Sequence, residues 1–190
     1  MPFNANRGGV IWLTGLSGAG KTTIARAAQQ ELLRQGIAAE VLDGDTIRET
    51  FSRGLGYSKA DRDENVRRTG CVAKLLASHG VVVLVALISP YRAAREEVRE
   101  EVERAGIPFL EVYVNAPLEV CEERDPKGLY HKARRGEIPS FTGVDDPYEA
   151  PVSPDRECRT DRESAQIAAN RILMAYERKN DRLRPFRLPA

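Results

Sequence analysis

The sequence lacks an apolar run that could cross a membrane. A transmembrane helix needs about 20 consecutive apolar residues, and the longest run here, 81–88, has eight. The first nine residues contain no apolar signal-peptide core. The 190-residue chain has three widely spaced cysteines and two histidines. The odd number and wide spacing of the cysteines argue against a disulfide framework or a zinc site, and we expect the cysteines to be small buried residues. Two histidines are too few for a histidine metal cluster. These absences predict a cytoplasmic protein without a membrane partner.

Net charge is nearly absent as well. The chain carries 29 Lys+Arg against 28 Asp+Glu, a net charge of +1, which argues against bulk electrostatic binding of nucleic acid. The charge is nevertheless locally uneven. Residues 124–135 hold five basic side chains against one acid, and residues 145–163 hold seven acids against three arginines. We therefore expect no nucleic-acid partner, and a concentrated basic segment that suits small, heavily charged ligands.

Apolar segments of strand and helix character alternate along the chain. Strands are expected at 10–14, 37–42, 81–88 and 109–114, and helices at 22–34, 59–78, 91–104 and 161–177, with short helices from 117 and over 129–135. This alternation predicts an α/β fold with a parallel sheet of about five strands and helices on both faces. Prolines and glycines break the pattern between 125 and 156, as in a lid. We expect one domain over 1–178 and a tail over 179–190.

A glycine-rich loop follows the first expected strand. The segment GLSGAGKT, Gly15 to Thr22, fits the phosphate-binding pattern G-x-x-x-x-G-K-[ST] between a strand and a helix. Its backbone N–H groups can surround a phosphate, Lys21 can reach the β- and γ-phosphates, and the Thr22 hydroxyl suits Mg²⁺. The motif predicts ATP binding and a P-loop NTPase-type three-layer sandwich. The expected nucleotide contacts are Gly15, Leu16, Ser17, Gly18, Ala19, Gly20, Lys21, Thr22 and Thr23.

The residues after the other strands favour a kinase over a GTPase or a motor ATPase. The run 81–88 ends in Ser89-Pro90 where many such hydrolases have an aspartate, and no Asn-Lys-x-Asp segment occurs. Asp43 and Asp45 flank a glycine after the second strand. One carboxylate can support Mg²⁺ through water, and the other can accept a proton from an attacking hydroxyl. The alternative is a turn with solvated aspartates.

Basic and amide side chains follow in the next segments. Arg48 lies three residues after Asp45, and Arg62 and Asn65 share one face of an expected helix. Guanidinium groups beside an amide suit a phosphate or a sulfate. An exposed charged helix explains the spacing equally well.

Several longer segments resemble the adenylyl-sulfate kinase (APS kinase) family, from about Gly9 to Ile172. They are GLSGAGKTT, LDGD, LGYS, DRDENVRR, ISPYR, PLEVCEERDPKGLY and FTGVDDPYEAP. The resemblance implies direct in-line transfer of the ATP γ-phosphate to the 3′-hydroxyl of adenosine 5′-phosphosulfate (APS), giving PAPS and ADP for sulfate assimilation. It implies Mg²⁺ and a homodimer, and it allows association with an ATP sulfurylase.

The resemblance also assigns roles to matched residues. Asp45 resembles the candidate base, Asp43 supports the metal through water, and Lys127 resembles a lid lysine. Ser89 stands where the family's phosphoserine is often placed, and we interpret it as a substrate-binding residue and not an obligatory nucleophile. The implied APS contacts are Asp45, Arg48, Tyr57, Arg62, Asn65, Ile88, Ser89, Lys127 and Phe141, with Tyr57 and Phe141 stacking on the adenine. Arg124 and Thr160 are expected near the ATP adenine.

Three residues depart from the family pattern. Thr46 replaces an asparagine, Tyr57 a phenylalanine, and His131 a lysine.

Two other functions are possible alternatives to an APS kinase. The first is another P-loop kinase that acts on a nucleotide or a sugar acid. The second is a nucleotide-binding regulatory module that has lost catalysis. The first does not explain DRDENVRR together with FTGVDDPYE, and the intact Lys21 and Asp45 argue against the second.

Overall fold

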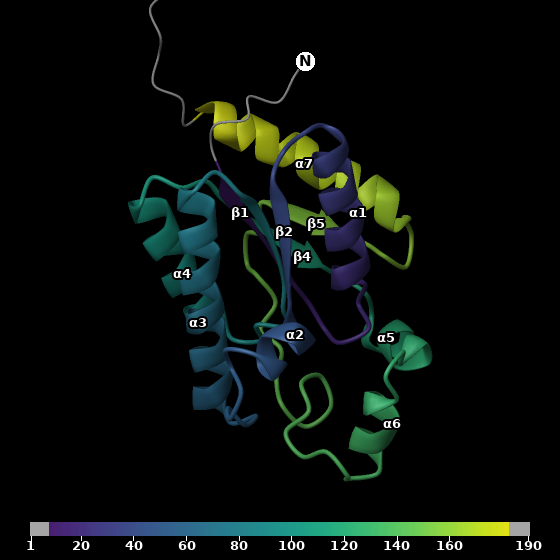
Figure 1. The fold of residues 1–190 in the computed structure, drawn as a ribbon. Coiled ribbons are helices and arrows are strands. Elements are labelled where there is room, and N and C mark those ends of the chain that lie inside the picture. The colour runs from purple at the N-terminus through teal and green to yellow at the C-terminus, as the bar shows by residue number, and fades with distance from the viewer. Residues whose placement is uncertain (1–7, 183–190) are drawn as a thin grey trace, which may run out of the picture.

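A five-stranded parallel sheet forms the centre of the molecule (Figure 1). The computed structural model describes residues 8–182. The strand order is β2-β3-β1-β4-β5, and all four pairings are parallel. The strands are β1 (Gly9–Thr14), β2 (Ala39–Asp43), β3 (Val82–Ala86), β4 (Phe109–Val114) and β5 (Arg156–Cys158). The predicted parallel sheet of about five strands is confirmed.

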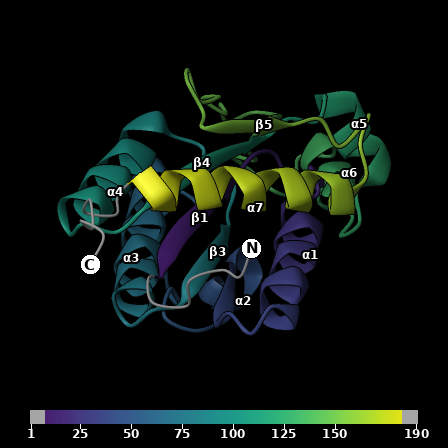
Figure 2. The same ribbon diagram turned by 90° about the horizontal axis from the view of Figure 1, so that it is seen from above.

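Helices cover both faces of the sheet, as the alternating pattern predicts. On one face α1 (Lys21–Arg34) packs beside α7 (Ala165–Arg182), and on the other α3 (Lys59–Ser78) packs beside α4 (Arg92–Arg104). Figure 2 shows the two layers on opposite sides of β1 and β3. Along β1, Ile11 and Leu13 join the α1 and α7 side, while Val10 and Trp12 join the α3 and α4 side. Because both faces are buried, the strands read as continuous apolar runs.

Two elements were not predicted from the sequence pattern. The helix α2 (Gly44–Glu49) begins directly after β2, because the Asp43 side chain accepts a hydrogen bond from the Asp45 backbone and caps it. The strand β5 has three residues, too few to show a period. Helices α5 (Leu118–Arg124) and α6 (Leu129–Arg134) lie where short helices were expected.

The last helix begins and ends later than the sequence suggests. It was expected over 161–177 and runs over Ala165–Arg182. Residues 179–182 of the expected tail are therefore helical, and 183–190 lie outside the described residues. The extension is explained by Lys179, which pairs with Asp155 at 2.9 Å and ties the helix to the loop before β5. The expectation for the cysteines also fails once, since Cys121 and Cys158 are buried and Cys71 is exposed.

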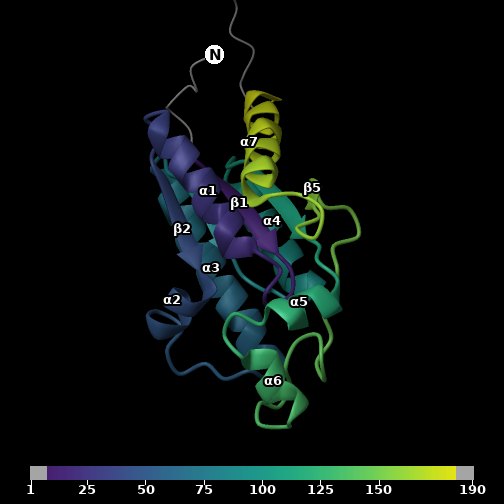
Figure 3. The same ribbon diagram turned by 90° about the vertical axis from the view of Figure 1, so that its right-hand side faces the viewer.

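The segment expected to form a lid lies beyond the carboxyl ends of the strands. Figure 3 shows α6 at this end, on the side away from the start of β1. The carboxyl ends of parallel strands are where ligands bind in open α/β sheets. Within residues 8–182, no helix is long and apolar enough to cross a membrane.

Candidate active site

A cavity of about 1030 Å³ opens where β1, β2 and β3 end. This volume is at the upper end of the range for small-molecule sites. It brings together most residues that the sequence singled out: Ser17, Gly18, Gly20, Lys21, Thr22, Thr23, Asp43, Asp45, Arg48, Tyr57, Arg62, Asn65, Ile88, Ser89, Arg124, Lys127, Phe141 and Thr160. Gly15, Leu16 and Ala19 of the phosphate loop do not line it. The sequence missed apolar lining residues such as Leu87, Ile138 and Ala165, which carry no polar signal.

The phosphate loop has the backbone shape that its glycines predict. Gly18 and Gly20 have φ angles of 72° and 98°, in the region that favours glycine. Gly20 caps α1 without a side-chain acceptor, so the first N–H groups of the helix face the cavity end. The Lys21 Nζ donates to the carbonyl oxygens of Gly15 and Leu16 at 2.8 and 2.7 Å. Burial lowers the pKa of Lys21 to about 8. A buried ammonium at a helix N-terminus favours a polyanionic ligand.

Thr22 and Asp43, both assigned to the metal region from the sequence, are in direct contact. The Thr22 hydroxyl donates to Asp43 Oδ2 at 2.6 Å, while Asp43 Oδ1 accepts from the Asp45 backbone at 3.0 Å. One carboxylate therefore joins the start of α1 to the start of α2. Within residues 8–182, no group of three or more His, Cys, Asp or Glu side chains could hold a metal ion by itself. A hydroxyl and a carboxylate beside a phosphate site fit Mg²⁺, which is usually held by few protein groups together with substrate phosphates.

Asp45 forms an ion pair with Lys127, a residue 82 positions later in the chain. Both side chains are at least half exposed, at the mouth of the cavity. The lysine belongs to the turn between α5 and α6, in the segment expected to form the lid. The candidate base and the candidate lid lysine are thus in direct contact.

The side chains predicted to bind the phosphosulfate surround Tyr57. The Arg48 guanidinium lies 4.4 Å from the centre of the Tyr57 ring, and the Arg62 guanidinium lies 5.5 Å away. Arg62 is buried and donates to the backbone carbonyls of Tyr57 at 2.9 Å and Ser140 at 2.6 Å. The Asn65 Oδ1 is buried without a hydrogen-bond partner. An exposed charged helix is therefore ruled out for Arg62 and Asn65, because α3 turns both into the cavity.

The two aromatic residues of the expected adenine sandwich line the same cavity from different elements. Tyr57 is 55% exposed, whereas Phe141 is buried and packs edge-on against Tyr130 with ring centres 5.0 Å apart. The Asp145 carboxylate accepts from the backbone N–H groups of Ser140 and Phe141 at 2.7 and 2.5 Å. These bonds lower the pKa of Asp145 and hold the Phe141 loop in place. Stacking of adenine between the two rings stays a prediction.

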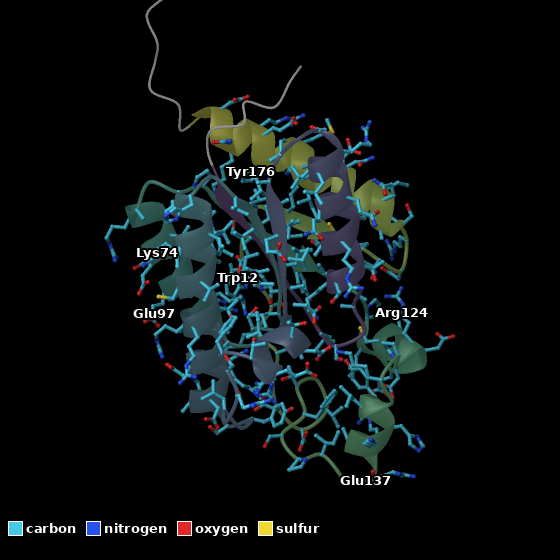
Figure 4. All side chains as sticks on the ribbon, viewed as in Figure 1. Trp12, Lys74, Glu97, Arg124, Glu137 and Tyr176 are labelled. Atoms are coloured by element: carbon cyan, nitrogen blue, oxygen red, sulfur yellow. The ribbon has the colours of Figure 1, made fainter. Side chains whose placement is uncertain are left out.

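Arg124 and Thr160 meet on the outer side of the phosphate loop. Arg124 donates to the Thr160 hydroxyl at 3.0 Å and to its carbonyl at 2.7 Å, and the Thr160 hydroxyl donates to the Ala19 carbonyl at 2.8 Å. Figure 4 shows Arg124 where α5 approaches the start of α1. The pair's expected position near the ATP adenine stays a prediction.

Ser89 has an unusual backbone and a satisfied side chain. Its φ angle is 41°, in the left-handed region that side chains disfavour. The Ser89 Oγ accepts a hydrogen bond from the Trp12 indole at 3.1 Å, and the residue is 4% exposed. The hydroxyl is therefore held against the sheet. This geometry favours a positioning role over a nucleophile.

A segment that supports the site has a role that the sequence did not reveal. Residues 145–150, here called the clasp segment, are joined to the loop after β3 and to α4. Glu149 N donates to the Pro90 carbonyl, Glu149 Oε2 accepts from Arg92 N, and Tyr91 donates to Asp146. The motif FTGVDDPYEAP was visible in the sequence, but only Phe141 was given a role. The partners lie 50 or more positions away, so local spacing could not predict them.

Comparison with known proteins agrees with this geometry. A model of the adenylylsulphate kinase family matches residues 7–159. An adenylyl-sulfate kinase from Gloeothece citriformis is 60% identical over 167 residues, covering 88% of this chain and 93% of that protein. One from Microcystis aeruginosa is 58% identical over 166 residues, covering 87% and 90%. A solved APS kinase of Mycobacterium tuberculosis, in complex with AMPPNP and APS, is 48% identical with a TM-score of 0.88, covering 90% and 99%. The chain belongs to the adenylyl-sulfate kinase family.

Proposed function

We propose that the protein transfers the γ-phosphate of ATP to the 3′-hydroxyl of APS, forming PAPS and ADP. One observation carries the proposal: a single cavity holds the phosphate loop with Lys21 together with Asp45 and the Arg48, Arg62 and Asn65 group. A kinase needs both substrates in one enclosure, because phosphoryl transfer is catalysed mainly by positioning and charge stabilisation. The solved relative that binds AMPPNP and APS supports both substrate assignments.

The chain's own residues divide the work between the two substrates. Lys21 and the N-terminus of α1 bind the β- and γ-phosphates, and Arg124 with Thr160 borders the ATP side. Thr22 would hold Mg²⁺ directly and Asp43 through water. The ion, when bound, neutralises charge on the transferring phosphate. Asp45 accepts the proton of the 3′-hydroxyl as that oxygen attacks in line, and Lys127 keeps this carboxylate at the mouth of the cavity.

A Ser89→Ala variant tests whether the γ-phosphate passes directly from ATP to APS. We expect Ser89→Ala to keep turnover within about tenfold of the wild-type rate, because loss of one hydroxyl partner for Trp12 costs about one hydrogen bond. The measurement is PAPS formation, with APS affinity determined separately by calorimetry. A variant that binds APS normally but forms no PAPS would show that the hydroxyl is an obligatory phosphate carrier.

The decisive experiment is direct. The folded protein is incubated with ATP, Mg²⁺ and APS, and PAPS and ADP are separated by chromatography. We expect both products in equal amounts. Phosphorylation of a sugar acid or another nucleotide in place of APS would favour the other P-loop small-molecule kinase. Binding of ATP without phosphorylation of any acceptor would favour the regulatory module.

Other features come from the resemblance or from the sequence pattern and stay predictions. They are the homodimer, the cytoplasmic location, the association with an ATP sulfurylase and the lid over 125–156. Two observations bear on the lid. Lys127 contacts Asp45 across the cavity mouth, and the clasp segment is fixed to the loop after β3. We therefore propose that movement is concentrated in the first half of the segment, around Lys127 and α6.

A further inference from the structure

The loop after β3 forms one wall of the cavity and contains a residue in an unfavourable backbone conformation. Ile88, Ser89 and Pro90 all line the cavity. Ser89 adopts a left-handed backbone conformation with φ of 41°. Such a conformation persists in a non-glycine residue only when its surroundings hold it. Contacts from β1, α4 and the clasp segment hold this loop, here called loop 88–90, in that conformation.

Two side chains of β1 hold the loop from the sheet. The Thr14 hydroxyl donates to the Ile88 carbonyl at 2.7 Å, and the Trp12 indole donates to Ser89 Oγ. Because the Thr14 hydrogen is used in this way, the Tyr148 phenol, 3.0 Å from Thr14 Oγ1, is the donor of that pair. A chain of hydrogen bonds thus leads from Tyr148 of the clasp segment through Thr14 to Ile88.

Arg95 of α4 connects the loop to the clasp segment directly. Its Nη1 donates to the Ser89 carbonyl at 2.7 Å and its Nη2 to the Glu149 carbonyl at 2.8 Å. Its Nε donates to Glu111 Oε1 of β4 at 2.9 Å. The side chain is 1% exposed, and Glu111 balances its charge. A planar guanidinium fixes the angles among its donors, so one side chain sets the position of three segments.

The clasp segment in turn positions groups on the side of the cavity assigned to APS, here called the acceptor side. Asp145 holds the Phe141 backbone, and Asp146 accepts from Tyr91 and lies 3.7 Å from the buried Arg62. Within the described residues, no hydrogen bond of Arg95 reaches the phosphate loop or Thr160. Arg95 is also absent from the residues that line the cavity. Its influence is therefore directed to one half of the site.

We infer that Arg95 is a positioning residue for the acceptor substrate, because it fixes loop 88–90, which lines the proposed APS site, to the clasp segment. The inference rests on the proposed function, because it assigns this half of the cavity to APS. Lysine in place of Arg95 would keep the charge for Glu111 but could not reach both carbonyls in the same geometry. The wall would then loosen on the APS side alone.

The test separates the two substrates. Arg95→Lys is expected to raise the KM for APS about tenfold or more, the scale of one lost charged hydrogen bond. The KM for ATP should stay within about twofold. The Kd for APS, measured by calorimetry in the presence of ADP and Mg²⁺, should rise by a similar factor. A general loss of stability would not discriminate between the substrates in this way.

Arg99→Lys is the matched control. Arg99 lies one turn further along α4 and also pairs with Glu111, at 3.3 Å, and with Asp155, at 3.0 Å. It donates to neither Ser89 nor Glu149. Both KM values of this variant should stay within about twofold of wild type. An equal rise in the KM for APS in the Arg99→Lys variant would overturn the inference.

A second variant covers the case in which Arg95→Lys does not fold. Tyr148→Phe removes only the hydroxyl that donates to Thr14, and it keeps the ring that stacks on Tyr113. We expect a rise of about threefold in the KM for APS alone. An unchanged KM for APS in every folded variant, or an equal rise for ATP, would overturn the inference. If the wild-type protein formed no PAPS at all, the proposed function would fail first, and this inference with it.

Discussion

Asp45→Asn is expected to lower kcat for PAPS formation by about 10²- to 10⁴-fold, the range for losing a general base. The amide has the same shape but cannot take the proton of the attacking hydroxyl. The fold should be unaffected, because the side chain is 62% exposed and makes its ion pair at the cavity mouth. Steady-state kinetics with saturating ATP and APS measures the loss, and the melting temperature checks the fold.

Glu49→Gln is the control for this variant. Glu49 is an exposed carboxylate at the other end of the same helix, α2, and it does not line the cavity. Its neutralisation changes the net charge by the same amount, and we expect a kcat within about twofold of wild type. If Asp45→Asn kept nearly the full rate, another group would have to accept the proton.

Lys21→Met is expected to abolish most activity and yet not to weaken the fold. Loss of the ammonium removes a positive charge placed on the transferring phosphates, and we expect kcat to fall by about 10²-fold or more. Stability should change in the opposite direction. Burial lowers the pKa of Lys21 from 10.5 to about 8, which means that folding disfavours the charged form.

The pH dependence of this stability difference has a defined sign. At pH 7 the lysine is charged in both the folded and the unfolded states, so the wild-type protein bears the full cost of burying the charge. The free energy of unfolding of Lys21→Met should then exceed that of wild type by up to about 3 kcal/mol. Above about pH 8 the folded wild type releases the proton, and the excess should shrink towards zero as the pH approaches 10.5.

Urea unfolding of both proteins at pH 7 and pH 10 measures this difference. Lys74→Met is the control, because Lys74 is a partly exposed residue of α3 that pairs with Glu101 and does not line the cavity, so its loss should change stability by less than about 1 kcal/mol. A Lys21→Met protein that was less stable than wild type at pH 7 would show that the hydrogen bonds to Gly15 and Leu16 outweigh the burial cost. The expected result is a functional side chain kept at the expense of stability.

The sequence predicted the parts of the site that depend on local order. The segment Gly15 to Thr22 predicts phosphate binding by itself, because a phosphate loop needs glycine backbone angles, a lysine and a hydroxyl at fixed spacing. The main strands and helices followed from apolar periodicity, and the α3 prediction had the observed ends because Ser58 caps it. The start of α7 was predicted four residues too early, since charged residues after Thr160 form turns and not helix.

The tertiary structure alone determined which polar groups meet. Two of these contacts join residues far apart in the chain, Asp45 with Lys127 and Arg124 with Thr160. A third involves Arg95, which is buried against the usual preference of charge for solvent and donates to Ser89 and Glu149. A buried arginine carries no periodic signal, because its burial depends on partners that the fold supplies. The same holds for β5, which is a strand only because β4 offers it an edge. Sequence thus determined the phosphate chemistry and the layers, whereas long-range hydrogen bonding decided the shape of the acceptor side.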